Sequence, residues 1–289
     1  MKRRFLSSLE FRQGWRPPAA LAPDPQRLWY QQHESYLDYR RFRGQDYTNP
    51  SWSMWDDPYE FEFSKRETGE LAELFSYLDV ETILSVGSNQ AFTELLMLRA
   101  KPELRVIASD INIPRNIEKD IARCTEFDFP PHCRELQYIK LDLRQAERDF
   151  PRERVDAIFI AATFCVVDDD IWKEFIAIAR TKGVRIFVIC HAEELCAASL
   201  LTLPIRRWVD RRWSKVWLGW LRDKRQVVSI FESSGYRLLH YAVIHSKGWR
   251  RLLSTVRIKW SKAVYLFCDE ASYHDVAPSY HFDLSRVYR

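Results

Sequence analysis

The segment that most constrains the fold is 82–110, where two short apolar runs flank one stretch with helical character. The first run, 83–86, stops at Gly87, and the serine and asparagine that follow are residues that often begin helices. The second run, 104–108, leads into Asp110. This order predicts a strand, a helix and a parallel strand, with both strand faces buried. Gly87 and Asp110 then lie at the carboxyl edge of the sheet, where open α/β sheets bind ligands.

The same alternation continues along the chain. Further strands are predicted at 136–141, 155–161 and 184–190, and helices at 66–77, 114–124, 168–180 and 225–232. Two last strands, 237–244 and 263–268, are joined by a polar segment that suits a long hairpin. The predicted fold class is therefore α/β: a doubly wound, seven-stranded, mostly parallel sheet with an antiparallel C-terminal hairpin.

This order of elements is similar to that of the class I S-adenosylmethionine-dependent methyltransferases, over roughly residues 66–270. In that family the first strand enters a glycine-rich turn that packs against the methionine part of the cofactor, because a Cβ atom there would occupy the ligand's space. Gly87 matches this turn. Asn89 and Ala91 stand at the positions of two further glycines, and Ser85 stands in the place of the usual strand-end acid.

The resemblance also implies roles for two acids. Asp110, 23 residues after Gly87, resembles the acid that accepts hydrogen bonds from both ribose hydroxyls. Asp142, after the third strand, resembles the acid that accepts from the adenine amino group. The alternative is that both are solvated strand-end carboxylates that cap the next helix. The cofactor-binding positions implied by the resemblance are Ser85, Gly87, Ser88, Asn89, Asp110, Ile111, Asp142, Leu143 and Ala161.

A glycine turn followed by an acid also suggests a dinucleotide-dependent oxidoreductase. That class requires three glycines in the pattern GxGxxG, and this turn has one, so the methyltransferase resemblance is favoured.

Methyl transfer is an in-line displacement that mostly requires alignment of donor and acceptor, and a hydroxyl acceptor benefits from a general base. His191, directly after the fifth predicted strand, and Glu193 are the predicted catalytic residues, with His191 as the base. The alternative for His191 is a partly exposed histidine near a helix start. Thr163 and Phe164, after the fourth strand, are expected to face the transferred methyl group.

The segment 203–225 combines tryptophans at helical spacing with basic side chains that include Arg222. Eight basic against two acidic residues give this segment a net charge of +6, compared with +4 for the whole chain. Three interpretations stay open: a helix packed by its tryptophan face on the core or a second subunit, peripheral membrane contact through 205–222, or contact with nucleic acid.

Four regions are predicted: an irregular, proline-rich arm at 1–25, an aromatic-rich cap or lid at 26–65, the α/β domain at 66–270, and a tail at 271–289. The basic, tryptophan-rich insertion occupies about 196–224 of the α/β domain. The cap is either a loop that covers the end of the core or a substrate wall, because aromatic rings beside acidic side chains suit a sugar-like ring with several hydroxyls.

Composition narrows the classes of protein to which this chain can belong. The chain has 289 residues and shows no run that approaches the ~20 apolar residues of a membrane span, and its start lacks the apolar core of a secretory signal. Its six cysteines include no CxxC pair, which favours buried free thiols over disulfides or a metal site. These patterns predict a soluble, cytoplasmic protein without a metal, which contacts the membrane at most at its surface.

The sequence therefore predicts S-adenosylmethionine-dependent methyl transfer to a small-molecule or glycan-type (saccharide) acceptor. One version of this prediction places the acceptor at the inner membrane surface. The main alternative is a catalytically inactive, methyltransferase-like binding or scaffold protein that has lost the cofactor. A nucleic acid methyltransferase is the third.

Overall fold

A computed structural model describes residues 58–88, 91–111, 117–122, 129–161, 163–164, 167–193, 222–244 and 262–284. The strands are β1 Thr82–Val86, β2 Arg105–Asp110, β3 Gln137–Lys140, β4 Ala157–Ala161, β5 Ile186–Glu193, β6 Tyr236–Ile244 and β7 Lys262–Asp269. The helices are α3 Pro58–Tyr77, α4 Phe92–Ala100, α5 Ile117–Ala122, α6 Ala146–Asp149, α7 Asp169–Thr181, α9 Lys224–Glu232 and α11 Glu270–Val276. Short 3₁₀ helices are η6 Pro131–Glu135, η7 Leu143–Gln145 and η9 Ala277–Ser279.

The strands of these residues form one seven-stranded sheet in the order β3-β2-β1-β4-β5-β7-β6. The first five pair in parallel, whereas β7 runs antiparallel to both β5 and β6. This arrangement confirms the seven predicted strands, the doubly wound topology and the antiparallel finish. The fifth strand is longer than predicted, because it continues past Cys190 to Glu193.

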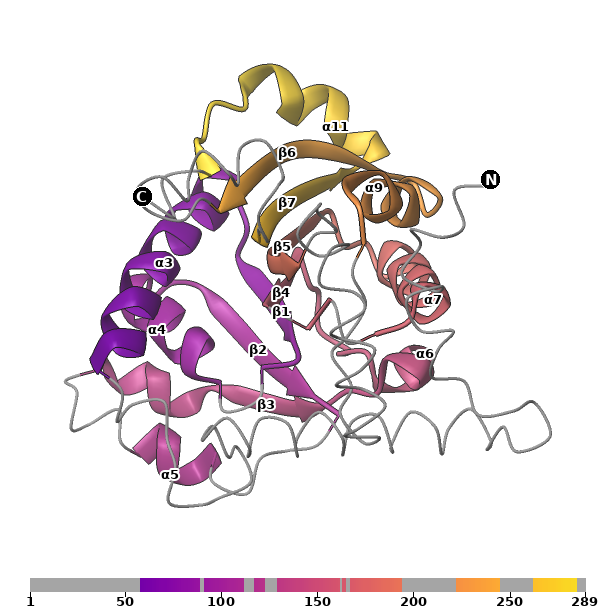
Figure 1. Ribbon diagram of the computed structural model, residues 1–289. Helices are drawn as coiled ribbons and strands as arrows, with labels where there is room; N and C mark the ends of the chain where they lie inside the picture. Colours follow the sequence, from indigo (N-terminus) through magenta and orange to yellow (C-terminus); the bar gives the residue numbers. More distant parts are fainter. Residues whose placement is uncertain are drawn as a thin grey trace, which may run out of the picture.

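Helices cover both faces of the sheet (Figure 1). Helices α3, α4 and α5 lie on one face, and α6, α7 and α9 lie on the other. Successive residues of β1 face opposite sides of the sheet. Ile83 therefore packs in the core under α3 and α4, and Leu84 packs in the core under α6, α7 and α9. Burial on both faces explains why the parallel strands are continuous apolar runs in the sequence.

Side chains and glycine define the ends of helix α7. Asp168 is the N-cap residue, and its carboxylate accepts a hydrogen bond from the backbone N–H of Asp170. Gly183, just after the helix, has a φ of 83°, the left-handed conformation common at helix ends. The helix predicted at 168–180 is therefore present, with an acidic cap at its start and a glycine just beyond its end.

Helix α3 begins at Pro58, eight residues before the predicted start at Arg66. Residues 58–65 were predicted to belong to the aromatic-rich cap, whereas the structure places them in this helix. Proline is favoured in the first turn of a helix, where its missing N–H costs no hydrogen bond.

Part of the predicted C-terminal tail is ordered against the domain. Helix α11 lies beside β6 and β7 (Figure 1). Beyond it, Leu284 is fully buried in the core, and the Tyr77 hydroxyl donates a hydrogen bond to the carbonyl of Ser279. The arm at 1–25, the cap up to residue 57 and the insertion up to residue 221 lie outside the described residues.

Candidate functional site

The candidate site lies where the connections after β1 and β4 diverge. These two strands are neighbours in the sheet, yet β1 leads to α4 on one face and β4 leads to α7 on the other. Such a switch point is the usual ligand position in an open α/β sheet. Gly87 follows β1 and Asp110 ends β2 at this edge, as the sequence predicts.

Gly87 is required here by its own backbone and by a neighbouring side chain. Its φ is 75°, which side chains of L-residues rarely allow. A Cβ atom at this position would lie 2.1 Å from Oγ1 of Thr163, which donates a hydrogen bond to the carbonyl of Ala161 at 3.1 Å. This space was expected to hold a ligand, whereas in the structure the Thr163 side chain fills it.

Three serines join the turn after β1 to the end of β2. The backbone N–H groups of Gly87 and Ser88 both donate to the carbonyl of Ser109, at 2.8 and 2.9 Å. The Ser88 hydroxyl accepts from the Ser109 N–H at 3.1 Å, and the Ser109 hydroxyl donates to the Ser85 carbonyl at 2.6 Å. Sequence analysis did not single out Ser109, although a hydroxyl in a buried strand was a usable signal. The turn is therefore held rigidly against β2.

Glu94 is a second residue that sequence analysis missed. It lies in the first turn of α4 with 2% of its surface exposed, and Ser85 donates a hydrogen bond to its Oε1. No described residue donates a hydrogen bond to its Oε2. Burial raises the pKa of this carboxyl, and the nearby Asp110 adds to the effect. A carboxyl group thus reaches the strand-end position from the helix, where the sequence shows only a serine.

Ala91 occupies one of the positions where the family has glycine. Its φ and ψ are 54° and 25°, a left-handed conformation, and its methyl group is fully buried at the start of α4. The backbone therefore keeps a glycine-like conformation without the glycine. Asn89 lies outside the described residues.

Asp110 and Ile111 are both partly exposed at the carboxyl edge. Asp110 pairs with Lys140 of β3 in the sheet register. Burial of the phenol is the main reason why the pKa of Tyr138 is raised, and the charge of Asp110 adds to this increase. A partly exposed carboxylate at this edge can accept two hydrogen bonds from a ligand.

The Asp142 carboxylate accepts hydrogen bonds from a residue of its own loop. Its Oδ1 accepts from the backbone N–H and Nε of Arg144 at 3.1 and 3.0 Å, and its Oδ2 accepts from Nη2 of the same arginine at 2.5 Å. These bonds start η7, in which Leu143 is buried. The capping role that the sequence left open is therefore present, and the adenine contact remains a prediction.

The other predicted site residues lie on the next two strands. Ala161, at the end of β4, is partly exposed. His191 is the third residue from the end of β5, and Glu193 is its last residue. The pairing of β5 with β7 is irregular between Ile189 and Ala192. The side chains of His191 and Glu193 lie outside the description, so their catalytic roles remain predictions.

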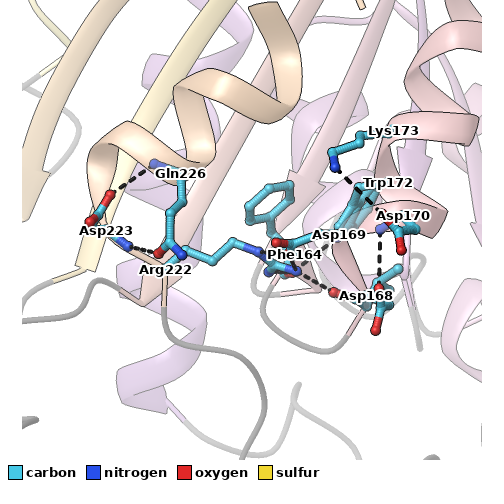
Figure 2. A network of polar contacts seen from close by, with 10 residues as sticks. Phe164, Asp168, Asp169, Asp170, Trp172, Lys173, Arg222, Asp223 and Gln226 are labelled. Carbon is cyan, nitrogen blue, oxygen red and sulfur yellow. Dashed lines mark hydrogen bonds and ion pairs between the residues drawn. The ribbon is translucent and has the colours of Figure 1, made fainter. Parts of the chain in front are cut away.

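Two residues lie elsewhere than the sequence predicted. Arg222, assigned to a basic face, has 1% of its surface exposed and forms an ion pair with Asp169 (Figure 2). Phe164, expected to face the transferred methyl group, is buried with its ring stacked on Trp172. Arg222 is therefore not available to bind the phosphates of a lipid or nucleic acid, because its guanidinium binds groups inside the domain.

Three further findings concern the described residues. These residues contain no group of three acidic, histidine or cysteine side chains arranged to hold a metal ion. Cys133, Cys190 and Cys268 are buried and form no disulfide with one another, and burial raises the pKa of Cys133 to about 11. None of the helices that the structure describes is both long and apolar enough to cross a bilayer.

No family model and no curated protein matches this chain. Solved structures do resemble it. The magnesium protoporphyrin IX methyltransferase of Synechocystis PCC 6803, with bound S-adenosylhomocysteine, superposes with a TM-score of 0.53 at 10% identity, over 83% of this chain and 99% of the other. An O-methyltransferase family protein from Burkholderia thailandensis gives a TM-score of 0.50 at 12% identity, over 84% and 70%. The chain therefore has the class I methyltransferase fold.

Proposed function

We propose that this protein transfers a methyl group from S-adenosylmethionine to a small-molecule acceptor. The observation that carries the proposal is the carboxyl edge of the sheet: a turn at Gly87 borders the switch point of a class I methyltransferase fold, and a partly exposed carboxylate, Asp110, ends the neighbouring strand β2. A ribose presents two adjacent hydroxyls, and one carboxylate can accept hydrogen bonds from both.

When bound, S-adenosylmethionine would supply an electrophilic methyl group on a sulfonium. The chain's own residues would hold and orient it: Asp110 at the ribose hydroxyls, the Gly87 turn at the methionine part, and Asp142 at the adenine amino group. In-line transfer needs alignment above all. For a hydroxyl acceptor, His191 would take the proton, with Glu193 beside it at the end of β5.

Three observations bear on the acceptor and on where it is bound. The similar structures include a porphyrin methyltransferase and an O-methyltransferase family protein, which favour a small organic acceptor. The aromatic and acidic residues of 26–65 favour a glycan-type acceptor, and the basic residues of 205–221 favour contact with an anionic membrane surface. The last two supports come from the sequence alone.

A binding or scaffold protein is the second candidate. The observation that favours it is the Asp142 carboxylate, which is already occupied by Arg144 on both oxygens. Adenine binding would have to share or displace that arginine. A nucleic acid methyltransferase is a third candidate, and it requires binding to RNA or DNA that weakens steeply with salt.

Calorimetric titration with S-adenosylhomocysteine separates these candidates. The wild-type protein should bind it, and Asp110→Asn should weaken binding at least tenfold, because charge-assisted hydrogen bonds are worth roughly 1.5–3 kcal/mol each. Asp269→Asn is the matched control: Asp269 also ends a strand and caps a helix, but at the opposite edge of the sheet, and should leave binding unchanged. A folded wild-type protein without detectable binding would overturn the enzyme proposal in favour of the scaffold.

A further inference from the structure

Arg222 is a buried cation with a complete set of partners. Its side chain comes from the residue directly before the N-cap of α9 and reaches across to the start of α7 (Figure 2). Nε donates to Oδ1 of Asp169 at 2.7 Å. A buried guanidinium needs such partners, because desolvation of an unpaired charge is strongly unfavourable.

The other two nitrogens of the Arg222 guanidinium bind the loop between β4 and α7. Nη1 donates to the carbonyl of Phe164 at 2.7 Å, and Nη2 donates to the carbonyl of Val167 at 2.5 Å. The Phe164 carbonyl also accepts from the indole N–H of Trp172 at 3.1 Å. Side-chain donors therefore satisfy these buried loop carbonyls, and the loop conformation depends on them.

The aromatic packing around the guanidinium adds to this dependence. The Arg222 guanidinium lies over the Phe164 ring, 4.7 Å from its centroid. The Phe164 ring also stacks on Trp172, at 5.0 Å between centroids. Phe164 is thus held through both its carbonyl and its ring, as Figure 2 shows. A planar, charged fork suits this position, and lysine could not reproduce it.

The loop held by Arg222 forms one wall of the turn at Gly87. Thr163 directly precedes Phe164, and its hydroxyl and methyl groups fill the space beside Gly87. The Thr163 hydroxyl also bonds the last carbonyl of β4, that of Ala161. A shift of Phe164 would therefore move Thr163 away from the turn on which cofactor binding is proposed to depend.

We infer that Arg222 is a positioning residue: through the carbonyls of Phe164 and Val167 it sets the place of Thr163, and thereby the conformation of the Gly87 turn. This inference rests on the proposed function only for its consequence, the affinity for S-adenosylhomocysteine. Its structural part concerns the described residues alone. Arg222 acts through the loop and not by touching a ligand.

The first experiment measures hydrogen exchange, which needs no ligand. The amides of Gly87 and Ser88 are hydrogen-bonded to the Ser109 carbonyl, so they should exchange slowly. In Arg222→Gln they should exchange at least tenfold faster. Arg180→Gln is the matched control, because Arg180 also donates to a carbonyl, that of Ser234, at the opposite end of α7. It should leave the Gly87 and Ser88 amides unchanged.

The second experiment measures affinity for S-adenosylhomocysteine at a temperature where both variants are folded by circular dichroism. Arg222→Gln should weaken binding at least tenfold, Arg222→Lys should be intermediate, and Arg180→Gln should stay within twofold of wild type. A purely structural role would lower the melting temperature without changing the affinity of the folded protein. If wild type binds no ligand, the proposed function fails while the exchange result still decides the positioning role. Unchanged exchange at Gly87 and Ser88 in folded Arg222→Gln would overturn the inference.

Discussion

Gly87→Ala tests whether the turn after β1 is restricted by packing as well as by its backbone. Alanine at a φ of 75° costs about 1–2 kcal/mol from the backbone alone. The new Cβ would also lie 2.1, 2.6 and 2.8 Å from Oγ1, Cγ2 and Cβ of Thr163. Moving Thr163 would cost its hydrogen bond to Ala161, about 1 kcal/mol, and repacking of about 1–3 kcal/mol. The expected total is roughly 3–6 kcal/mol of the free energy of unfolding.

The assay is equilibrium urea unfolding of Gly87→Ala beside Gly183→Ala. Gly183 has a φ of 83° but nothing within 4 Å of its missing Cβ, so its variant isolates the backbone cost. The difference between the two variants should be about 2–4 kcal/mol, the sum of the hydrogen-bond and repacking costs. A Thr163→Ala change should recover part of it in the double variant, since it removes the two closest atoms and leaves a contact at 2.8 Å.

Equal destabilisation of the two glycine variants would refute this reasoning. It would mean that Thr163 moves aside without cost, and that the turn can adjust to a side chain. The same result would also weaken the link between the β4 loop and the Gly87 turn, on which the role inferred for Arg222 depends.

Three further predictions concern single side chains. Because burial raises the pKa of Glu94, the folded state keeps a proton that the unfolded state has lost above about pH 4.5. Its contribution to stability is therefore complete below that pH and is lost as pH rises through the raised pKa, so Glu94→Gln should gain stability relative to wild type between about pH 5 and 8 in urea unfolding. Ala91→Gly should be nearly neutral, within about 1 kcal/mol, because relief of the left-handed alanine offsets the lost methyl group, whereas Ala157→Gly in β4 should destabilise clearly by the same assay. Tyr236→Phe should cost about 1–3 kcal/mol in thermal unfolding, because the hydroxyl donates to the buried carbonyl of Val184 at 2.7 Å.

Much of the fold could be predicted because strand and helix patterns are local. The run 83–86 is apolar throughout because Ile83 and Leu84 enter different core clusters, and such a run predicts a strand buried on both faces. Asp110 was found for the same reason: it lies at the end of the strand that the apolar run 104–108 predicts, so its place at the sheet edge follows from strand direction alone. The start of α3 at Pro58 was missed because proline ends helices as well as begins them.

The site could be predicted only in outline. Ser85 marked a missing acid, but the carboxyl that approaches it comes from Glu94, nine residues later and on another element. Ala91 marked a missing glycine, although its backbone is left-handed as glycine's would be. Neither fact is visible in a pattern of residue types, because one depends on how α4 packs on β1 and the other on a backbone angle.

The sequence by itself determined the seven strands, their parallel and antiparallel parts and the edge at which Gly87 and Asp110 meet, since burial and chain direction are written in the periodicity of apolar residues. Only the tertiary structure decided which individual polar groups are buried and which partners they bind. Arg222 belongs by sequence to a strongly basic segment, yet in the fold it is buried on Asp169 and two loop carbonyls. A charged side chain is exposed or buried according to the partners that distant segments bring to it, and those partners exist only after folding.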